Sequence, residues 1–353
     1  MTPEEFDLAL PEIKKAMFDD KAPELMSAAL SQAQKMVYPQ GQAMALLYRG
    51  EYLIDLGEQP GLAFKDFREA GLIARQLRNW NLLAQTLHWQ AQSQLLQGEY
   101  MRALDVWLQA LQTAIEAEDS RAFIRGYSGI AQVCLVFGQL DISLEYQRRA
   151  LMLADSVPDI ALQIDCLLAL IATCYRRQLF DEMRNLLVRL KEKIKLRPHL
   201  ETQAEFHIYS GLIHLDLHEL DQAFEHLQLA RVLAKQFGGL WCRSFVALIL
   251  GRIYLQQGRL EDAKASLEQC LHLGEQIKGF AMGQEAHQLL EELCAAQGDY
   301  QGALVHLDYA HVQQLSLFQR QAERKLTRVF QKPLHQIEVA LRLELSRIRY
   351  SQI

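Results

Sequence analysis

Histidines are the residues in this 353-residue chain whose spacing comes nearest to metal chemistry. They cluster at His207, His214, His218 and His226, and the middle two are four residues apart. On one helix that spacing would place two imidazoles on the same face, where they could share a metal ion. The zinc-protease pattern needs a glutamate directly after the first histidine, where this chain has Leu215. His214 also falls on a packing position and His218 on a turn, so we expect packed or solvated histidines and no metal site.

Cysteine or nucleophile chemistry has no better support. The six cysteines form no C-x-x-C pair, and Cys134, Cys174 and Cys294 are separated by 40 and 120 residues, multiples of one spacing. A position that recurs at a fixed spacing indicates packing, because a nucleophile is not expected three times. The chain has no phosphate-binding loop and no G-x-S-x-G turn. We therefore predict no catalysis and no cofactor, and expect any catalytic part to lie beyond residue 353.

Composition places the chain among soluble, helix-rich proteins. Half of the residues are apolar, 23% are charged, and the net charge is −6, a balance that excludes disordered and collagen-like classes. The mild acidity gives no general reason to expect nucleic acid as a partner. Glu4 and Glu5 stand where a signal peptide needs basic residues, and no apolar run approaches a membrane span. The prediction is a cytoplasmic protein without membrane insertion.

A turn signal that recurs every 40 residues organises the chain. It consists of a glycine followed two residues later by tyrosine or leucine, as at Gly98, Gly138, Gly258 and Gly298, with an earlier copy at Gly57 and glycine-free copies between. After each turn comes a small or apolar residue, then apolar residues four and seven positions further on, a spacing that marks one face of an α-helix. Glycine tolerates the left-handed conformation that ends a helix. Each turn signal therefore predicts a helix end.

A second set of helix breakers lies midway between these turns, at Asn79, Asp119, Pro158, Pro198 and Gly238. Each repeat is thus predicted to hold two helices of about 16 to 18 residues joined by short loops. No stretch shows the two-residue alternation of strands. A helical hairpin cannot bury its apolar face alone, so neighbouring hairpins must stack. The predicted class is an all-α array of antiparallel helix pairs.

The signature Gly-x-[Tyr/Leu]-x-x-Ala-x-x-x-[Leu/Trp]-x-x-Ala resembles the tetratricopeptide repeat over about 270 residues. It departs from that family in its period, which is usually about 34 residues, and in lacking the closing proline. Repeats of this length are similar to those of bacterial sensory arms, including peptide-binding quorum-sensing regulators and the sugar-sensing arm of a maltotriose-activated transcription regulator. The resemblance implies a right-handed superhelical solenoid whose first helices line a concave binding groove.

On this basis we divide the chain into a degenerate capping hairpin at 1–38, seven repeats at 39–312 and a C-terminal segment at 313–353. The family's groove positions on the first helices are polar here. They are Gln85, His88, Gln92, Arg125, Ser128, Gln132, Asp165, Tyr175, Arg176, Glu205, Asp216, Arg252, Gln256, Glu285, Gln288 and Glu292. The resemblance implies that these residues contact a ligand; the alternative is that they are only the solvated side of each helix.

Two basic stretches stand out, 176–197 and 312–353, each with eight Lys or Arg against three Asp or Glu. For the first, solvated helix faces are the favoured interpretation, since no groove-reading nucleic-acid motif accompanies the charges. The second includes Pro333, which suits a first helical turn, followed by apolar residues at spacings of three and four: Leu334, Ile337, Leu341, Leu345 and Ile348. This seam predicts either a capping helix over the last repeat or a coiled-coil helix that forms a homodimer.

The repeats, followed by Leu317–Gln321 and then a charged helix, also resemble, more weakly, the junction in bacterial diguanylate cyclases and histidine kinases with tetratricopeptide sensory arms. Together these features predict a binding module of a sensory or regulatory kind. It would take a peptide, protein segment or small ligand in the first-helix groove and control oligomerisation or a linked output domain. The alternatives are a structural scaffold or adaptor and the sensory arm of a transcription regulator.

Overall fold

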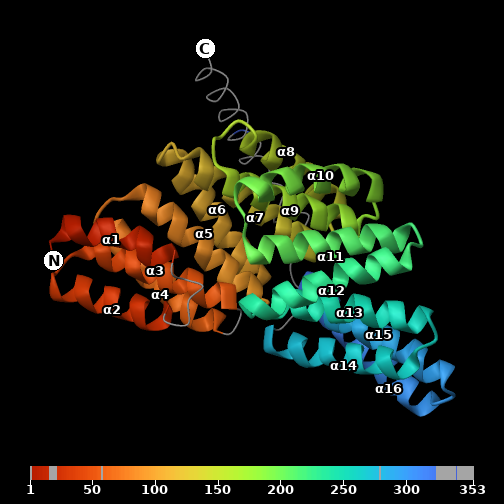
Figure 1. Ribbon diagram of the computed structural model, residues 1–353. Coiled ribbons are helices and arrows are strands. Elements are labelled where there is room, and N and C mark those ends of the chain that lie inside the picture. Colours follow the sequence, from red (N-terminus) through yellow and green to blue (C-terminus); the bar gives the residue numbers. More distant parts are fainter. Residues whose placement is uncertain (1, 16–21, 57–58, 278–279, 323–338, 340–353) are drawn as a thin grey trace. The chain divides into compact units, whose positions relative to one another are not determined.

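A computed structural model describes residues 2–15, 22–56, 59–277, 280–322 and 339. All regular elements within these ranges are α-helices, which confirms the all-α class. The chain divides into two compact units. Unit 1 comprises Met1–Val133 with Met152–Val157, and unit 2 comprises Cys134–Leu151 with Pro158–Ile353. The division falls inside α7 and α8, and each unit is described by itself below (Figure 1).

The helices follow the 40-residue spacing of the turn signals. In and around unit 1 they are α1 (Pro3–Lys15), α2 (Ala22–Lys35), α3 (Pro39–Leu56), α4 (Pro60–Gln76), α5 (Trp80–Leu96), α6 (Tyr100–Glu116), α7 (Ser120–Val136) and α8 (Leu140–Ala154). Unit 2 continues with α9 (Ile160–Arg176), α10 (Phe180–Leu196), α11 (Leu200–Asp216), α12 (Leu220–Phe237), α13 (Leu240–Gln256), α14 (Leu260–Ile277), α15 (Phe280–Ala296) and α16 (Tyr300–Ala322). From α3 onward these are antiparallel pairs, one pair to each repeat, stacked as a solenoid within each unit.

The turns take the conformation that the glycine signal predicts. Gly98 and Gly258 have φ of +76° and +71°, values that L-residues rarely adopt. In the glycine-free repeats Gln178 and His218 take the same conformation, both with φ of +59°. Gly57 lies outside the described residues. Glycine therefore favours the left-handed residue that ends each helix, but the hairpin forms this turn without glycine as well.

Side chains cap the first helices where breakers were predicted. The backbone N–H of Leu82 donates to Asn79 Oδ1 at 3.1 Å, and the N–H of Leu162 donates to Asp159 Oδ1 at the same distance. Asp119 caps α7 in the same way through Ala122. Such caps satisfy backbone donors that have no partner inside the helix. Asn79 thus caps the start of α5, and the residue before it, Arg78, takes the left-handed conformation with φ of +53°.

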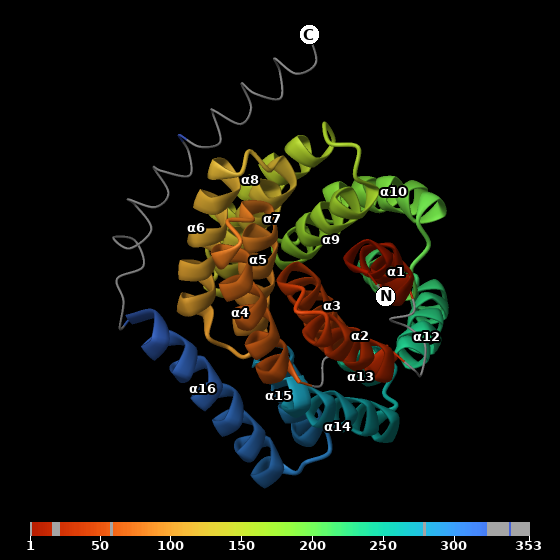
Figure 2. The ribbon, with the colours of Figure 1, turned by 90° about the vertical axis from the view of Figure 1, so that its left-hand side faces the viewer.

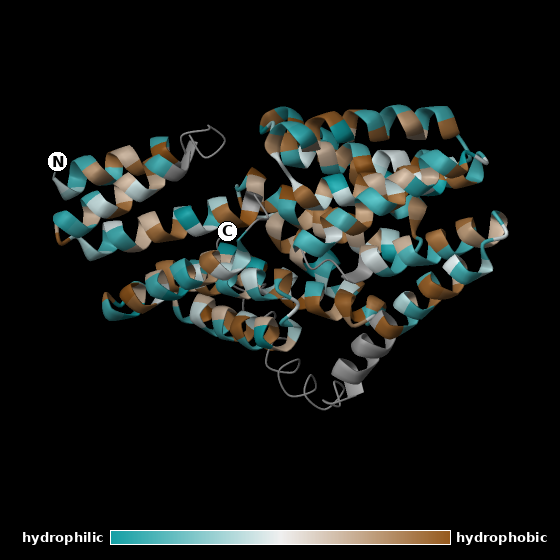
Figure 3. Ribbon diagram, turned by 90° about the horizontal axis from the view of Figure 1, so that it is seen from below, coloured by the Kyte–Doolittle hydropathy of each residue, from teal (hydrophilic) through white to brown (hydrophobic). Residues whose placement is uncertain are grey.

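Small residues on the first helices receive large residues from the second helices. A Cβ built on Gly50 would lie 2.4 Å from the ring of Phe67, and one on Gly251 would lie 2.7 Å from Leu267. Phe67 and Leu267 are fully buried. Colouring by hydropathy shows hydrophobic and hydrophilic residues alternating around the helices, as this packing requires (Figure 3). The core is therefore a line of close contacts repeated once in each hairpin.

Gly251→Ala is expected to destabilise the chain by about 1–3 kcal/mol, because the added methyl group overlaps the buried Leu267 side chain. Gly274→Ala is the matched control, since its Cβ would meet only Ser244 Oγ at 4.0 Å. On α14 that change should be neutral or stabilise by up to about 1 kcal/mol through helix propensity. Urea denaturation followed by circular dichroism measures both variants, and equal midpoints would contradict the packing described here.

In unit 2 the first helices also contact one another in sequence order, α9 with α11, α11 with α13 and α13 with α15. Figure 2 shows α9 beside its own partner α10. Side chains on the first helices of consecutive repeats can therefore meet at one site. None of the helices in the described part of the chain is both long enough and apolar enough to cross a membrane.

Candidate functional site

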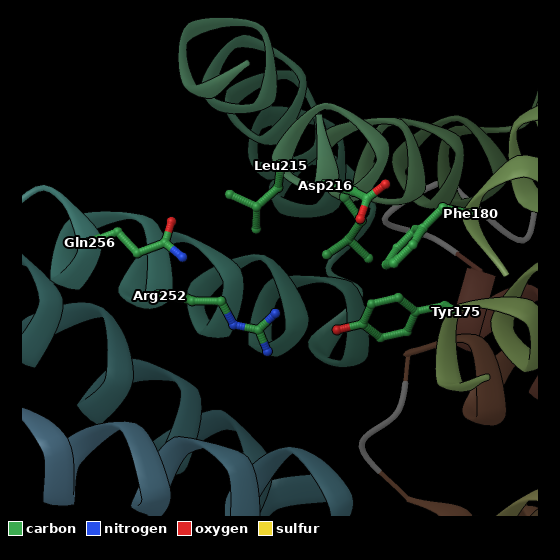
Figure 4. Close-up of a pocket in the computed structure, with 7 residues that line it drawn as sticks. Tyr175, Phe180, Leu215, Asp216, Arg252 and Gln256 are labelled. Carbon is green, nitrogen blue, oxygen red and sulfur yellow. The ribbon is translucent and has the colours of Figure 1, made fainter. Parts of the chain in front are cut away.

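A pocket of about 150 Å³ lies where the C-terminal ends of α9, α11 and α13 meet in unit 2. Its lining combines aromatic, aliphatic, amide and charged groups: Tyr175, Phe180, Leu212, Leu215, Asp216, Arg252 and Gln256. The Tyr175 hydroxyl and the Arg252 guanidinium point toward one another in Figure 4. Four of these residues, Tyr175, Asp216, Arg252 and Gln256, are predicted groove residues. The stacking of three repeats thus brings together positions far apart in sequence.

An ion pair orients the cation of this pocket. Arg252 on α13 pairs with Glu285 on α15, another predicted groove residue, and both side chains are about 30% exposed, at 28% and 31%. A guanidinium has five N–H donors in a fixed fork, so one carboxylate does not use them all. Arg252 is therefore held in place with donors left for a second acceptor, such as a carboxylate or a carbonyl oxygen of a ligand.

Aromatic rings cluster next to the pocket around Phe245 of α13. The Phe245 ring centroid lies 5.9 Å from that of Tyr175, 6.4 Å from that of Tyr209 and 5.3 Å from that of Trp241. Trp241 keeps 39% of its surface exposed, whereas Phe245 and Tyr209 are buried. The Trp241 ring therefore remains partly accessible to a ligand, and it packs against the buried ring of Phe245.

Carboxylates gather at the other end of α11. Burial and the Asp165 carboxylate raise the pKa of Glu201 to about 7. Burial, together with the carboxylates of Glu201 and Asp165, raises the pKa of Glu205 well above its usual value. Like charges at close range disfavour one another's ionised form, and a cation placed among them relieves that cost. Asp165 and Glu205 are predicted groove residues.

One face of α11 joins these features. Glu201, Glu205, Tyr209, Leu212 and Asp216 follow one another at spacings of four, four, three and four residues, which places them within about 80° around the helix. We call these five residues the α11 stripe. Its length from Glu201 to Asp216 is about 22 Å at about 1.5 Å per residue. The stripe runs from the carboxylates, past the aromatic rings, to the pocket that contains Arg252.

Other predicted groove residues lie elsewhere. In unit 1 the Trp107 indole N–H donates to His88 Nδ1 at 3.3 Å, so His88 takes part in packing between α5 and α6. Ser128 is buried. Half-buried positions are taken by Gln85, Gln92, Arg125 and Gln132. In unit 2 Arg176, Gln288 and Glu292 are exposed and do not line the pocket. The site assembled by the structure therefore uses only part of the predicted set.

Sequence reasoning missed Glu201, Phe180, Leu212 and Leu215. Glu201 carried a signal, because it precedes Glu205 by four residues and so shares its helix face. Phe180 and the two leucines have the pattern of packing residues, and nothing in their spacing separates them from the core. The apolar seam Leu334, Ile337, Leu341, Leu345 and Ile348 lies outside the described residues.

The histidines form hydrogen-bonded pairs between the two helices of a repeat. His207 and His226 are joined Nδ1 to Nδ1 at 2.9 Å, and His287 and His306 repeat this pair two repeats later at 3.0 Å. His214 Nδ1 lies 2.6 Å from Glu219 Oε2. In the described part of the chain no three His, Cys, Asp or Glu side chains are arranged to hold a metal ion.

The His207–His226 pair should make stability fall with acid. Burial, followed by His226 and Lys191, lowers the pKa of His207 to about 4. A lowered histidine pKa contributes stability that is present above the unfolded value of about 6.5 and is lost as the pH falls toward 4. We expect the Tm of His207→Asn to fall less than that of the original chain between pH 7 and 4.5. The exposed His272→Asn variant should follow the original chain, and three identical pH profiles would contradict this effect.

The recurring cysteines are core residues. Cys134, Cys174 and Cys294 are all buried. Burial raises the pKa of Cys134 and of Cys174 to about 12, which keeps both thiols protonated at neutral pH. The basic stretch 176–197, which includes α10, forms surface ion pairs such as Arg177 with Asp141 at 2.6 Å and Lys195 with Glu192 at 2.7 Å.

Comparison with known proteins supports the repeat class. Residues 246–273, which span the end of α13 and most of α14, match the family described as Tetratricopeptide repeat. No curated protein is similar enough in sequence to count as a relative. The chain is thus a helical-repeat protein with tetratricopeptide-like hairpins.

Solved structures of low sequence identity share the fold. A Rap protein in complex with the competence and sporulation factor is similar with a TM-score of 0.64 and 14% identity, over 98% of this chain and 99% of that one. The Rap conjugation gene regulator of plasmid pLS20 in complex with the Phr* peptide has a TM-score of 0.63 and 14% identity, over 82% and 78%. Aspartyl phosphate phosphatase F from Bacillus subtilis has a TM-score of 0.58 and 15% identity, over 82% and 74%.

Proposed function

We propose that this protein is a peptide-binding regulatory module that holds an extended peptide over the first helices of unit 2, between the pocket at the C-terminal end of the α11 stripe and the carboxylates at its N-terminal end. The observation that carries the proposal is the pocket at the end of the stripe, where Arg252, Asp216 and the Tyr175 hydroxyl surround an apolar floor of Leu212 and Leu215. Arg252, held by Glu285, is suited to bind the terminal carboxylate of a peptide. The leucines and Phe180 are suited to its last side chain.

Pocket size favours a peptide over a compact small ligand. Sites that enclose small molecules usually measure about 300–1,000 Å³, whereas this pocket measures about 150 Å³. That volume suits one apolar side chain. A ligand anchored there needs further contacts outside the pocket, and the aromatic rings and carboxylates along α11 supply them.

Charge and length define the peptide further. The carboxylates of Asp165, Glu201 and Glu205 favour a cation, and Arg252 favours an anion about 22 Å away along α11. An extended chain rises by about 3.3 Å per residue, so about six or seven residues bridge the two ends. The proposed ligand is therefore a short peptide with an amino-terminal or basic group at one end and a free carboxylate at the other.

The structural neighbours support this class of ligand. Two proteins that share the fold are complexes by name: the Rap protein with the competence and sporulation factor, and the pLS20 regulator with the Phr* peptide. On this basis we also infer a cytoplasmic regulatory arm. Occupancy of the stripe would be reported through α13, α15 and α16 to the segment 313–353, whose seam would act on oligomerisation or on a linked output domain such as a diguanylate cyclase.

Affinity selection from a pool of random hexapeptides tests the proposal. The full chain is expected to enrich peptides that carry a basic residue or free amine in the first half and an apolar residue at a free carboxyl terminus. The same pool with amidated carboxyl termini should show little enrichment, because Arg252 then lacks its anionic partner. Failure to enrich any peptide, or equal enrichment from both pools, would contradict the proposed function and favour an adaptor for folded proteins.

A further inference from the structure

The last hairpin exposes an apolar position that the preceding repeats bury. The eighth residue of the second helix is Phe67, Trp107, Gln147, Leu187, Leu227 and Leu267 in successive repeats, and all are 0–6% exposed. The equivalent residue of α16, Leu307, is 49% exposed. On the same helix Leu304 is 58% exposed and Tyr300 is 76% exposed. Tyr300, Leu304 and Leu307, which we call the terminal face, thus form an exposed apolar surface, and Leu307 occupies a position that is buried in the other repeats.

A buried eighth residue packs on the first helix of its own repeat, as Phe67 does at Gly50, and can also contact the first helix of the following repeat. A Cβ on Gly129 of α7 would lie 2.2 Å from the ring of Trp107 in the preceding α6, which shows how closely that helix approaches. After α16 no repeat signature follows, and α16 is 23 residues long where the other second helices have 15 to 18. The terminal face therefore needs an occupant of another kind.

We infer that the C-terminal segment 333–353 folds back in the same molecule and covers the terminal face of α16. This segment contains an apolar seam of helical spacing, Leu334, Ile337, Leu341, Leu345 and Ile348, which matches the exposed leucines in character. The inference does not depend on the peptide-binding proposal, because it rests on the other end of unit 2. Of the two roles that the sequence left open for the seam, it selects the capping helix.

Charge complementarity supports this occupant. Residues 280–311 contain five Asp or Glu and no Lys or Arg, whereas residues 312–353 contain eight Lys or Arg and three Asp or Glu. The last hairpin therefore has a charge of −5 and the segment after it +5. Two terminal faces from separate copies would meet with like charge, which disfavours direct pairing of one hairpin with another. A basic amphipathic helix that docks on the apolar face of this acidic hairpin is stabilised both by burial of apolar surface and by attraction between opposite charges.

Chain length allows the segment to reach its face within one molecule. The distance along α16 from Leu304 to Ala322 is about 27 Å, and the ten residues between Ala322 and Pro333 can extend to about 33 Å. A short tether gives an effective concentration in the millimolar range. Docking within the chain therefore outcompetes docking onto a second copy at ordinary protein concentrations.

Hydrogen exchange and light scattering on the full-length, peptide-free chain test the inference. Leu341→Asp changes the middle of the seam, and Ser346→Asp is the control of equal charge at a polar position. We expect the original chain to be a monomer, and we expect Leu341→Asp to speed exchange of the α16 amides about tenfold while Ser346→Asp leaves it unchanged. Unchanged α16 exchange in Leu341→Asp would overturn the inference, as would a dimer that Leu341→Asp converts to a monomer.

A substitution on the terminal face provides the reciprocal test. Leu307 and Leu229 are equally exposed, at 49% and 51%, and Leu229 lies on α12 away from the array's end. If the segment covers the terminal face, Leu307→Asp should make residues 333–353 about tenfold more sensitive to trypsin, while Leu229→Asp should not. Equal sensitivity in the two variants would overturn the inference.

Discussion

Replacing Trp107 by alanine should lower the free energy of unfolding by about 3–5 kcal/mol. Trp107 is the largest fully buried side chain of the described residues and lies at the eighth position of α6. Its loss would leave a cavity beside Gly129 and would remove the N–H that donates to His88. Because stacked hairpins depend on their neighbours, the damage should spread to α5 and α7. Few single substitutions in unit 1 should have a larger effect.

Urea denaturation followed by circular dichroism measures this loss. Trp241→Ala is the matched control, because Trp241 is 39% exposed and its removal opens no enclosed cavity. We expect the control to shift the midpoint by a small fraction of the Trp107→Ala shift. If the two variants have the same midpoint, the buried role of Trp107 is wrong.

Arg252→Gln is expected to weaken binding of the carboxylate-ended peptides enriched in the selection by about 30-fold or more. The estimate follows from about 2–5 kcal/mol for truncating one partner of a hydrogen-bonded charge pair. Glutamine keeps polar donors but cannot present a charged fork. The change should also leave Glu285 without its ion-pair partner, which adds a like charge near the incoming carboxylate.

Isothermal titration with the enriched peptide and with its amidated form measures this effect. Arg231→Gln removes an exposed arginine of α12 and serves as the control for the change in net charge. The control should bind both peptides as the original chain does, and Arg252→Gln should bind them with similar, weak affinity. Discrimination between the two peptides that survives in Arg252→Gln would place the carboxylate elsewhere.

The helices could be predicted from sequence because their signals are local. Glycine or a capping residue marks each helix end, and alanine, leucine or tryptophan at spacings of four and three marks the packed face. First helices accordingly begin at Trp80, Ser120, Ile160, Leu200 and Leu240, 40 residues apart. Where glycine was absent, at Gln178 and His218, the register of the repeat still located the turn.

The sequence could not predict that the residues lining the pocket lie together at one site. Its residues come from the ends of three first helices and the start of α10, and their meeting depends on how far each hairpin rotates relative to the next. Sequence spacing identifies a polar face but not this rotation. For the same reason His88 was predicted as a groove residue, whereas in the structure it accepts a hydrogen bond from Trp107.

The amino-acid sequence by itself determined an all-α array of hairpins with a 40-residue period, since helix ends, caps and packed faces are encoded within each repeat. Only the tertiary structure decided which side chains of different repeats meet, such as Arg252 with Glu285 and Phe245 with Tyr175 and Tyr209, and that Leu307 remains 49% exposed. The physical reason is that a helix periodicity specifies directions around one axis, whereas a binding site depends on the placement of several axes together.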